Sequence, residues 1–210
     1  MANLVVLRRE MVEVGRLMEN KGLIVATEGN LSVRLGGHSF LVSPSGVGKG
    51  EMRVQDLLEV GDDGTTSRGK VTSEWPLHHT IYQTRPDVKA ICHAHSPWST
   101  AFACAGRDLD GRLLTETADL LPRVPLAPRA QPGTDSLAAS VIPFIRDHDA
   151  VLLGNHGVVA VGKDLRAAFA LLQTVERLAQ VTLLTEMAQG NCGLEAGVRQ
   201  GLLDGWQKGY

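Results

Sequence analysis

The stretch "TSEWPLHHTIYQTRPDVKAICHAHSP" runs from Thr72 to Pro97 and holds four of the seven histidines of the chain. Its first half predicts a helix over residues 73–85, which Ser73 could cap and whose first turn tolerates a proline. Its second half predicts a strand over residues 88–95. Side chains two positions apart point to the same face of a strand, so His93 and His95 project together. They form a good pair of metal ligands, although a buried histidine satisfied by a hydrogen bond is the commoner arrangement.

A third histidine ligand would strengthen the metal interpretation, and the best candidate is His156 in "GNHG". This motif joins two apolar segments that predict a hairpin over residues 150–162, so His156 is either a turn residue or a presented ligand. Three neutral imidazoles with an open fourth position are the usual form of a catalytic divalent-metal site. His78 and His79 differ, because adjacent helical side chains point about 100° apart and cannot serve one site. We expect them to be packed or hydrogen-bonded.

Glu74 has two interpretations that the local sequence leaves equally open. As a carboxylate at the start of a helix, it would stabilise the positive end of the helix dipole. As a carboxylate beside a metal site, it would ligate the ion or move a proton.

Two glycine-rich stretches predict turns that can gather hydrogen-bond donors around an anion. They are "ATEGNLS", residues 26–32, and "SPSGVGKG", residues 43–50. Neither fits a nucleotide-binding motif, since "GVGKGE" lacks the spacing of both the P-loop and the dinucleotide fingerprint. Each has an ordinary turn interpretation. Together with "VTSE", residues 71–74, they are typical of a phosphate site built without arginine.

The rest of the chain intermixes helices and strands without strict alternation. Further helices are expected over residues 4–20, 53–60, 96–106, 134–148 and 164–189, and further strands over residues 30–35 and 39–43. Residues 111–134 predict an irregular connection around one strand. We expect a single domain over residues 1–210, with a weakly packed tail at 191–210.

The bulk composition excludes several classes of function. The net charge of −2 and the isoelectric point near 6.4 argue against a nucleic-acid partner. No apolar run approaches the roughly 18–20 residues that cross a membrane. The three cysteines make no disulfide framework, and Cys92 and Cys104 lie in apolar runs where we expect both to be buried. The first residues resemble neither a signal peptide nor a transit peptide, so we expect a cytoplasmic protein.

The motifs occur together in a pattern that resembles the class II aldolase/adducin family. They are Thr27-Glu28-Gly29-Asn30, Ser45-Gly46, Thr72-Ser73-Glu74, "HAH" and "GNHG". The resemblance runs from about Gly15 to Gly190. The Ser73-Glu74-Trp75 form is closest to the L-fuculose-1-phosphate aldolases, whereas related 4-epimerases carry Asp where Glu74 stands.

This resemblance implies an α/β fold of three layers (α-β-α), in which helices flank a central, mainly antiparallel sheet. It implies a homotetramer with active sites near the subunit interfaces. It also implies one divalent metal per subunit, Zn²⁺ or else Mn²⁺, Co²⁺ or Fe²⁺, on His93, His95 and His156. Glu74 would ligate the metal, leave when substrate arrives, and then act as acid and base. The residues implied to hold the substrate phosphate are Thr27, Gly29, Asn30, Ser45, Gly46, Thr72 and Ser73.

The sequence departs from the family pattern where a tyrosine acts as a second proton donor. The segment "GRLLTETADLLPRVPLAP" contains no tyrosine, and Glu116 or Asp119 could stand in for it. Arg129 stands where many relatives have tyrosine, and Tyr210 could take the part of a C-terminal tyrosine. These differences concern the aldehyde half of the substrate.

The function we expect is a metal-dependent aldolase that cleaves a ketose 1-phosphate to dihydroxyacetone phosphate and an aldehyde. Charge would grow on the C2 oxygen as the C3–C4 bond breaks, and Glu74 would return a proton to C3. A decarboxylase, dehydratase or 4-epimerase of a sugar phosphate or sugar acid phosphate could use the same metal site. A non-catalytic adducin-like module is disfavoured, because the three histidines and Glu74 are all present.

Overall fold

The computed structural model describes residues 4–190, which build a sheet of seven strands in the order β3-β2-β1-β4-β9-β8-β7. Its strands are β1 (Asn30–Gly36), β2 (Ser39–Val42), β3 (Leu58–Gly61), β4 (Ala90–Ala94), β7 (Leu126–Ala127), β8 (Ala150–Leu153) and β9 (Gly157–Gly162). All neighbours are antiparallel except β7 and β8, so the expectation of a mainly antiparallel sheet is confirmed. Strands β5 (Leu109–Asp110) and β6 (Arg123–Val124) form a separate small ladder.

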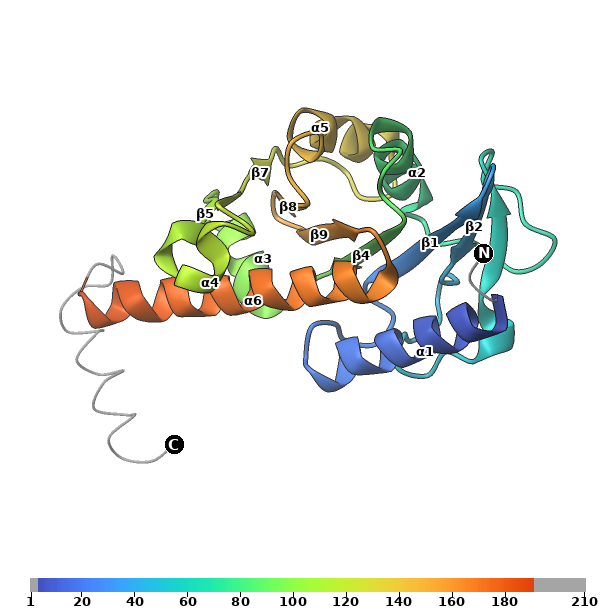
Figure 1. Ribbon diagram of the computed structural model, residues 1–210, viewed down its shortest axis with the longest axis horizontal. Helices are drawn as coiled ribbons and strands as arrows, with labels where there is room; N and C mark the ends of the chain where they lie inside the picture. Colours follow the sequence, from blue (N-terminus) through green and yellow to red (C-terminus); the bar gives the residue numbers. More distant parts are fainter. Residues whose placement is uncertain (1–3, 191–210) are drawn as a thin grey trace.

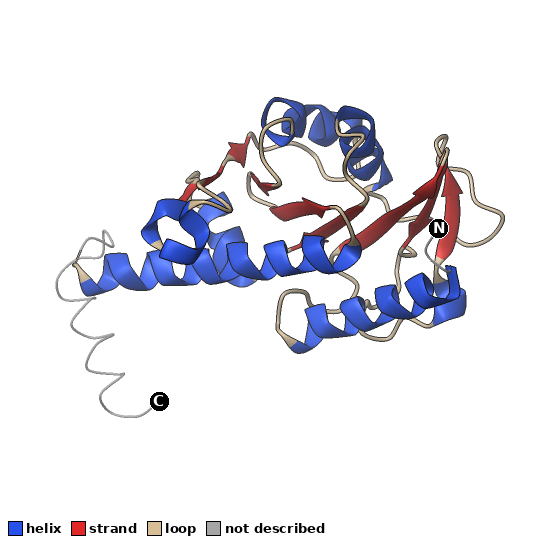
Figure 2. Cartoon of the chain, in the orientation of Figure 1, coloured by secondary structure: helices blue, strands red, loops and turns tan. Residues whose placement is uncertain are grey.

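Helices cover both faces of the large sheet (Figures 1 and 2). They are α1 (Leu4–Asn20), α2 (Trp75–Thr84), α3 (Pro97–Cys104), α4 (Thr115–Ala118), α5 (Asp135–Ile145) and α6 (Leu165–Ala188), with single 3₁₀ turns at Val54–Asp56 and Gly111–Leu113. Helices α2 and α5 pack with one apolar cluster. Helices α1, α3 and α6 pack with a second cluster on the other face. This is the expected three-layer α/β arrangement.

The alternation of side chains along β4, the middle strand, positions the functional residues. Ala90, Cys92 and Ala94 belong to the cluster under α1, α3 and α6, while Ile91 belongs to the cluster under α2 and α5. His93 is two positions from Ile91 and therefore faces the helix that Glu74 begins.

Strand β1 continues this polar patch across the sheet. Leu31 and Val33 pack into the cluster on the α1 side. Asn30 and Ser32 therefore point the other way, toward α2. Asn30 pairs directly with His93 in the ladder between β1 and β4. Two adjacent strands thus present polar side chains beneath one helix.

Three expectations about local structure were wrong. Residues 53–60 form only a 3₁₀ turn followed by β3, because Leu58 and Val60 alternate with exposed Glu59 as a strand requires. The segment 111–134 holds two short strands and α4 rather than one strand. Cys104 is exposed at the end of α3, whereas Cys92 is buried as expected.

No helix within residues 4–190 is both long enough and apolar enough to cross a membrane. The expected weakly packed tail, together with Cys192 and Tyr210, lies outside the described residues.

Candidate metal centre and substrate cleft

His93 is held rigidly at the centre of the sheet. It is fully buried, and its Nδ1–H donates to the Val158 carbonyl of the neighbouring strand at 2.9 Å. Its Nε2 consequently points away from β9, toward Nε2 of His95 at 3.1 Å. The predicted strand geometry is therefore present, with both rings on one face.

His156 lies on the turn between β8 and β9, which brings it over the same face. Asn155 takes a left-handed conformation there (φ 56°), a region that Asn adopts more readily than most residues. Gly157 lies so close to β4 that a Cβ atom would come within 2.4 Å of the Ala94 carbonyl. The absence of a side chain at Gly157 thus lets the turn place His156 beside β4.

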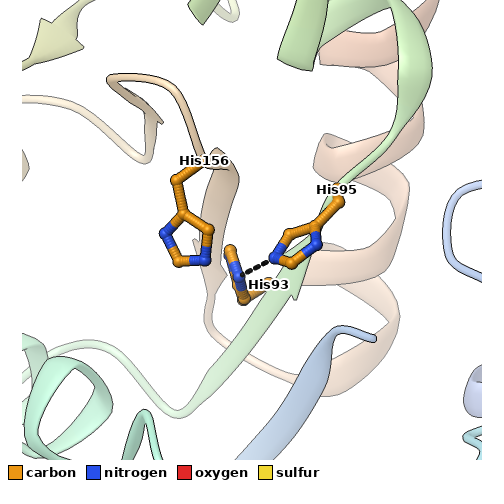
Figure 3. Close-up of side chains that lie close together, drawn as sticks. All are labelled: His93, His95 and His156. Atoms are coloured by element: carbon orange, nitrogen blue, oxygen red, sulfur yellow. Dashed lines mark hydrogen bonds between the residues drawn. The ribbon is translucent and has the colours of Figure 1, made fainter. Parts of the chain in front are cut away.

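The three histidines converge as a metal site requires (Figure 3). One ligand atom from each of His93, His95 and His156 lies within 4.8 Å of the others. Neutral imidazole nitrogens facing one another repel unless a proton or a cation lies between them. The three nitrogen donors therefore fit a divalent ion that prefers imidazole ligands.

Glu74 occupies the N-cap position of α2, where the sequence suggested Ser73, and its side chain makes no capping hydrogen bond. The carboxylate turns instead toward the histidines. Oε2 lies 2.9 Å from His93 Nε2 and accepts from Asn30 Nδ2 at 3.0 Å. Oε1 lies 3.2 Å from His156 Nε2, in a geometry that is not a hydrogen bond. These contacts favour the chemical interpretation of Glu74 over the helix-dipole one.

Electrostatics in the site follow from burial and from these contacts. Burial opposes charge on Glu74, but His93 and His156 outweigh it and lower the pKa of the carboxyl. Burial opposes charge on His93 too, yet Glu74 raises the pKa of that ring. Burial and the charge of His93 lower the pKa of His95, and they lower that of His156 to about 4. His95 and His156 are thus neutral at physiological pH, as ligands must be.

A cavity of about 340 Å³ lies beside this centre and collects the predicted phosphate residues. Its walls are Thr27, Glu28, Gly29, Asn30, Pro44, Ser45, Gly46, Lys49, Thr72, Ser73, Glu74, His95, Pro132 and His156. Gly29 has a positive φ of 66°, and a Cβ there would come within 2.8 Å of the His93 carbonyl. Only glycine lets this loop lie against β4.

Two residues that line the cavity were missed by the sequence analysis. Lys49 is almost fully buried, and its Nζ donates to the Thr27 and Val47 carbonyls at 3.0 and 2.8 Å, which joins two of the loops. Among residues 4–190, no carboxylate lies within ion-pairing distance of Lys49. Glu28 Oε1 lies 3.5 Å from His95 Nδ1, where it can orient that ring. Neither role could be read from spacing, because both depend on how the loops fold back.

The other two histidines of the opening stretch are hydrogen-bonded or packed, as expected. His79 stacks on Trp75, with ring centroids 5.6 Å apart. His78 is fully buried and bonds to Ser32 and Asn30. Burial, followed by the charge of His93, lowers the pKa of His78 to about 3, so its ring is neutral.

Glu116 and Asp119, two of the residues proposed for the aldehyde half, do not line this cleft within one chain. Glu116 is exposed and lines a different cavity of about 720 Å³, together with Trp98 and Glu176. Asp119 is exposed at the end of α4. The larger cavity contains none of the three histidines, so the smaller one is the better candidate for chemistry.

The family follows from comparison with known proteins. The sequence profile described as "Class II Aldolase and Adducin N-terminal domain" matches residues 9–183. The chain belongs to the class II aldolase/adducin family.

Members of this family with different reactions are similar to the chain. The 5-methylthioribulose-1-phosphate/5-deoxyribulose-1-phosphate aldolase of Rhodospirillum rubrum is 35% identical over 84% of this chain and 80% of that protein. The 3-oxo-tetronate 4-phosphate decarboxylase of Escherichia coli K12 is 32% identical over 85% of this chain and 86% of that protein. The crystal structure of L-fuculose-1-phosphate aldolase from Thermus thermophilus superimposes with a TM-score of 0.80 at 35% identity, covering 90% and 98% of the two chains. The expected family, fold and lyase class are confirmed.

Proposed function

We propose that this chain is a divalent-metal-dependent aldolase that cleaves a ketose 1-phosphate to dihydroxyacetone phosphate and an aldehyde. One observation carries the proposal. Glu74 touches two histidines of the metal cluster and, at the same time, lines the cavity that holds every predicted phosphate residue. A proton-transfer group, a Lewis-acid site and an anion site in one cleft are what this cleavage needs.

His93, His95 and His156 are the proposed metal ligands, with Glu74 as a fourth ligand before substrate binds. We propose Zn²⁺, while Mn²⁺, Co²⁺ and Fe²⁺ accept the same nitrogen donors. A divalent ion there would supply Lewis acidity, stabilising negative charge on the substrate as the bond breaks. Within residues 4–190, His156 Nδ1 and Glu74 Oε1 are buried without a hydrogen-bond partner. Buried polar atoms without a hydrogen-bond partner fit a site that binds an ion or a substrate group.

Glu74 is the proposed proton-transfer group. Cleavage of the C3–C4 bond requires C3 to gain a proton, while the C4 hydroxyl loses one as the aldehyde forms. Asn30 holds Oε2 of Glu74, which leaves Oε1 free to exchange a proton with C3. The buried position excludes bulk water from the transfer.

The phosphate is assigned to the polar residues and turns that line the cavity beside the metal centre. Asn30, Ser45, Thr72 and Ser73 bring side-chain donors there, and the turns at Gly29 and Gly46 bring backbone N–H groups. Thr27 completes the set from the same loop as Gly29. Because the phosphate does not react, its binding energy orients the sugar toward Glu74.

The proton on the C4 hydroxyl needs a second group, which we assign to a neighbouring copy of the chain. The proposed assembly is a cytoplasmic homotetramer, with Glu116, Asp119 or Tyr210 of a neighbour completing each cleft. Replacing each in turn (Glu116→Gln, Asp119→Asn, Tyr210→Phe) tests this. Replacing the residue that exchanges the C4 hydroxyl proton should slow cleavage. It should leave proton exchange on dihydroxyacetone phosphate unchanged, because exchange involves no aldehyde.

A decarboxylase is the second candidate, and the Escherichia coli relative favours it. Loss of CO₂ from a 3-oxo acid phosphate leaves negative charge on a similar carbon, so the same metal site and Glu74 would serve. Metal analysis followed by a screen of ketose 1-phosphates and 3-oxo acid phosphates separates the two. Release of dihydroxyacetone phosphate supports the aldolase, whereas release of CO₂ alone supports the decarboxylase.

A further inference from the structure

A buried chain of polar groups runs from the interior of the protein to Glu74. Its members are Tyr82, Ser32, His78, Asn30 and Glu74, and each is 5% exposed or less. They come from β1, from α2 and from the residue that begins α2. The proposed reaction uses only the last two members, so the burial of the other three polar groups needs a reason.

The hydrogen-bond directions along this chain follow from the ionised carboxylate. Glu74 Oε2 can only accept, so Asn30 presents Nδ2 to it at 3.0 Å. Asn30 Oδ1 then faces His78 Nε2, which must carry a hydrogen. The neutral ring keeps its lone pair on Nδ1, where it accepts from Ser32 Oγ at 2.6 Å. Ser32 Oγ in turn accepts from the Tyr82 hydroxyl at 2.8 Å. Each of these polar atoms has a hydrogen-bond partner in this arrangement.

The opposite orientation of the Asn30 amide is excluded by the same contacts. It would press Oδ1 against the Glu74 carboxylate, so that two acceptors would face each other in a buried site. It would also aim an amide N–H at the N–H of His78. The Nε2–H of His78 therefore stabilises the same orientation of Asn30 that the Glu74 carboxylate requires.

We propose that His78 is a positioning residue for the proton-transfer group. Its Nε2–H holds the Asn30 amide, which anchors Oε2 of Glu74 and presents Oε1 to the substrate. This role rests on the proposed function of Glu74. Oε1 is the oxygen that lacks a hydrogen-bond partner among residues 4–190 and lies beside His156. A carboxylate anchored at one oxygen keeps the other at a fixed place, which proton transfer to carbon requires.

A matched pair of substitutions tests the role of the Nε2–H. The amide of His78→Gln extends about as far as Nε2 and can still donate to Asn30. The amide of His78→Asn extends only as far as the position of Nδ1, so it can hydrogen-bond to Ser32 but not to Asn30. Metal content and thermal unfolding identify variants that fold and load normally. Tyr82→Phe is the control, because it removes the distal hydroxyl while Ser32 still donates to His78.

The activity readout is exchange of the C3 proton of dihydroxyacetone phosphate in heavy water. We expect kcat for exchange to fall roughly tenfold to hundredfold in His78→Asn, because an Asn30 amide that is no longer held would lose its hydrogen bond to the charged Glu74 carboxylate. KM should change little. His78→Gln should recover most of the loss, and Tyr82→Phe should exchange at nearly the parent rate. Equal losses in the Gln and Asn variants would overturn the proposal.

A second readout needs no catalysis and no variant. Nitrogen-15 NMR of the histidine rings in the metal-loaded parent should show His78 as the neutral tautomer with its hydrogen on Nε2. A hydrogen on Nδ1, or on both nitrogens, would overturn the positioning role. A parent that exchanges no proton would instead overturn the aldolase proposal, and the tautomer would still decide the inference about His78.

Discussion

The two walls of the cleft are built in different ways. The sheet wall consists of His93, His95, His156 and Glu74. The loop wall consists of residues 26–30, 44–49 and 72–73. In the sheet wall the side chains contact one another across 2.9–3.2 Å. In the loop wall the side chains lie on separate turns, with Thr27 and Ser73 exposed.

This difference predicts two responses to mutation. Residues of the sheet wall share one ion and one proton, so removing any one of them should disable the whole unit. Donors of the loop wall act in parallel on a single anion, so each should cost only its own hydrogen bond.

Removing a histidine of the sheet wall should abolish metal binding and activity together. For His93→Ala or His156→Ala we expect a loss of about 10³-fold or more in kcat/KM, because Lewis-acid stabilisation is worth several kcal/mol. Metal analysis of the purified variants gives the first readout. His79→Ala is the control, since His79 stacks on Trp75 outside the cluster. Full metal content in both His93→Ala and His156→Ala would show that the ion binds elsewhere.

Removing one donor of the loop wall should weaken substrate binding and leave the metal in place. Ser45→Ala should raise KM for the phosphorylated substrate by roughly 10- to 100-fold, since a hydrogen bond to a charged group contributes about 1.5–3 kcal/mol. Asn30→Ala should raise KM and also lower kcat, because Asn30 holds Glu74 as well. Steady-state kinetics with metal-loaded protein separates the two patterns. An unchanged KM in both variants would contradict the proposal that the loop wall binds the phosphate.

Lys49 should give the loop wall a pH-dependent stability. Burial lowers the pKa of Lys49 from 10.5 to about 8. Between these values the unfolded chain binds the proton more tightly, so the free energy of unfolding should rise as pH rises from about 8 to 10.5. The rise due to this group amounts to at most about 3 kcal/mol. Urea denaturation of the parent and Lys49→Met across this range is the measurement. Parallel pH profiles for the two proteins would contradict the prediction.

The placement of the histidines in the sheet wall could be predicted from local sequence patterns. The two-residue repeat of a strand places His93 and His95 on one face without any tertiary information. The glycines around His156 indicated a tight turn, and Gly157 does lie against β4. Glu74 could not be assigned from its own neighbours, because its partners are Asn30 and His93, which are distant in the chain.

Other features depend on long-range packing that local patterns do not contain. Residues 53–60 are rich in leucine and predicted a helix, but Leu57 packs on one face of the sheet and Leu58 on the other. Lys49 stands in a turn that was interpreted as part of an anion site through its glycines and hydroxyl groups, and the carbonyls that Lys49 Nζ contacts lie 2 and 22 residues away. The hydrogen bond between Tyr82 and Ser32, the first of the buried polar groups, joins α2 to β1 across 50 residues. Such contacts become visible only when the strands are paired.

The central claim is that Glu74 moves the proton at C3, and one measurement tests it most directly. The parent and Glu74→Gln, both loaded with metal, are compared for exchange of the C3 proton of dihydroxyacetone phosphate in heavy water. The amide keeps the shape of the side chain but cannot shuttle a proton at neutral pH. We predict that exchange falls by roughly 10²-fold or more, while metal content is unchanged. If Glu74 only stabilises the helix dipole, Glu74→Gln should lose at most about 1 kcal/mol of stability. Exchange at the parent rate would then contradict the account.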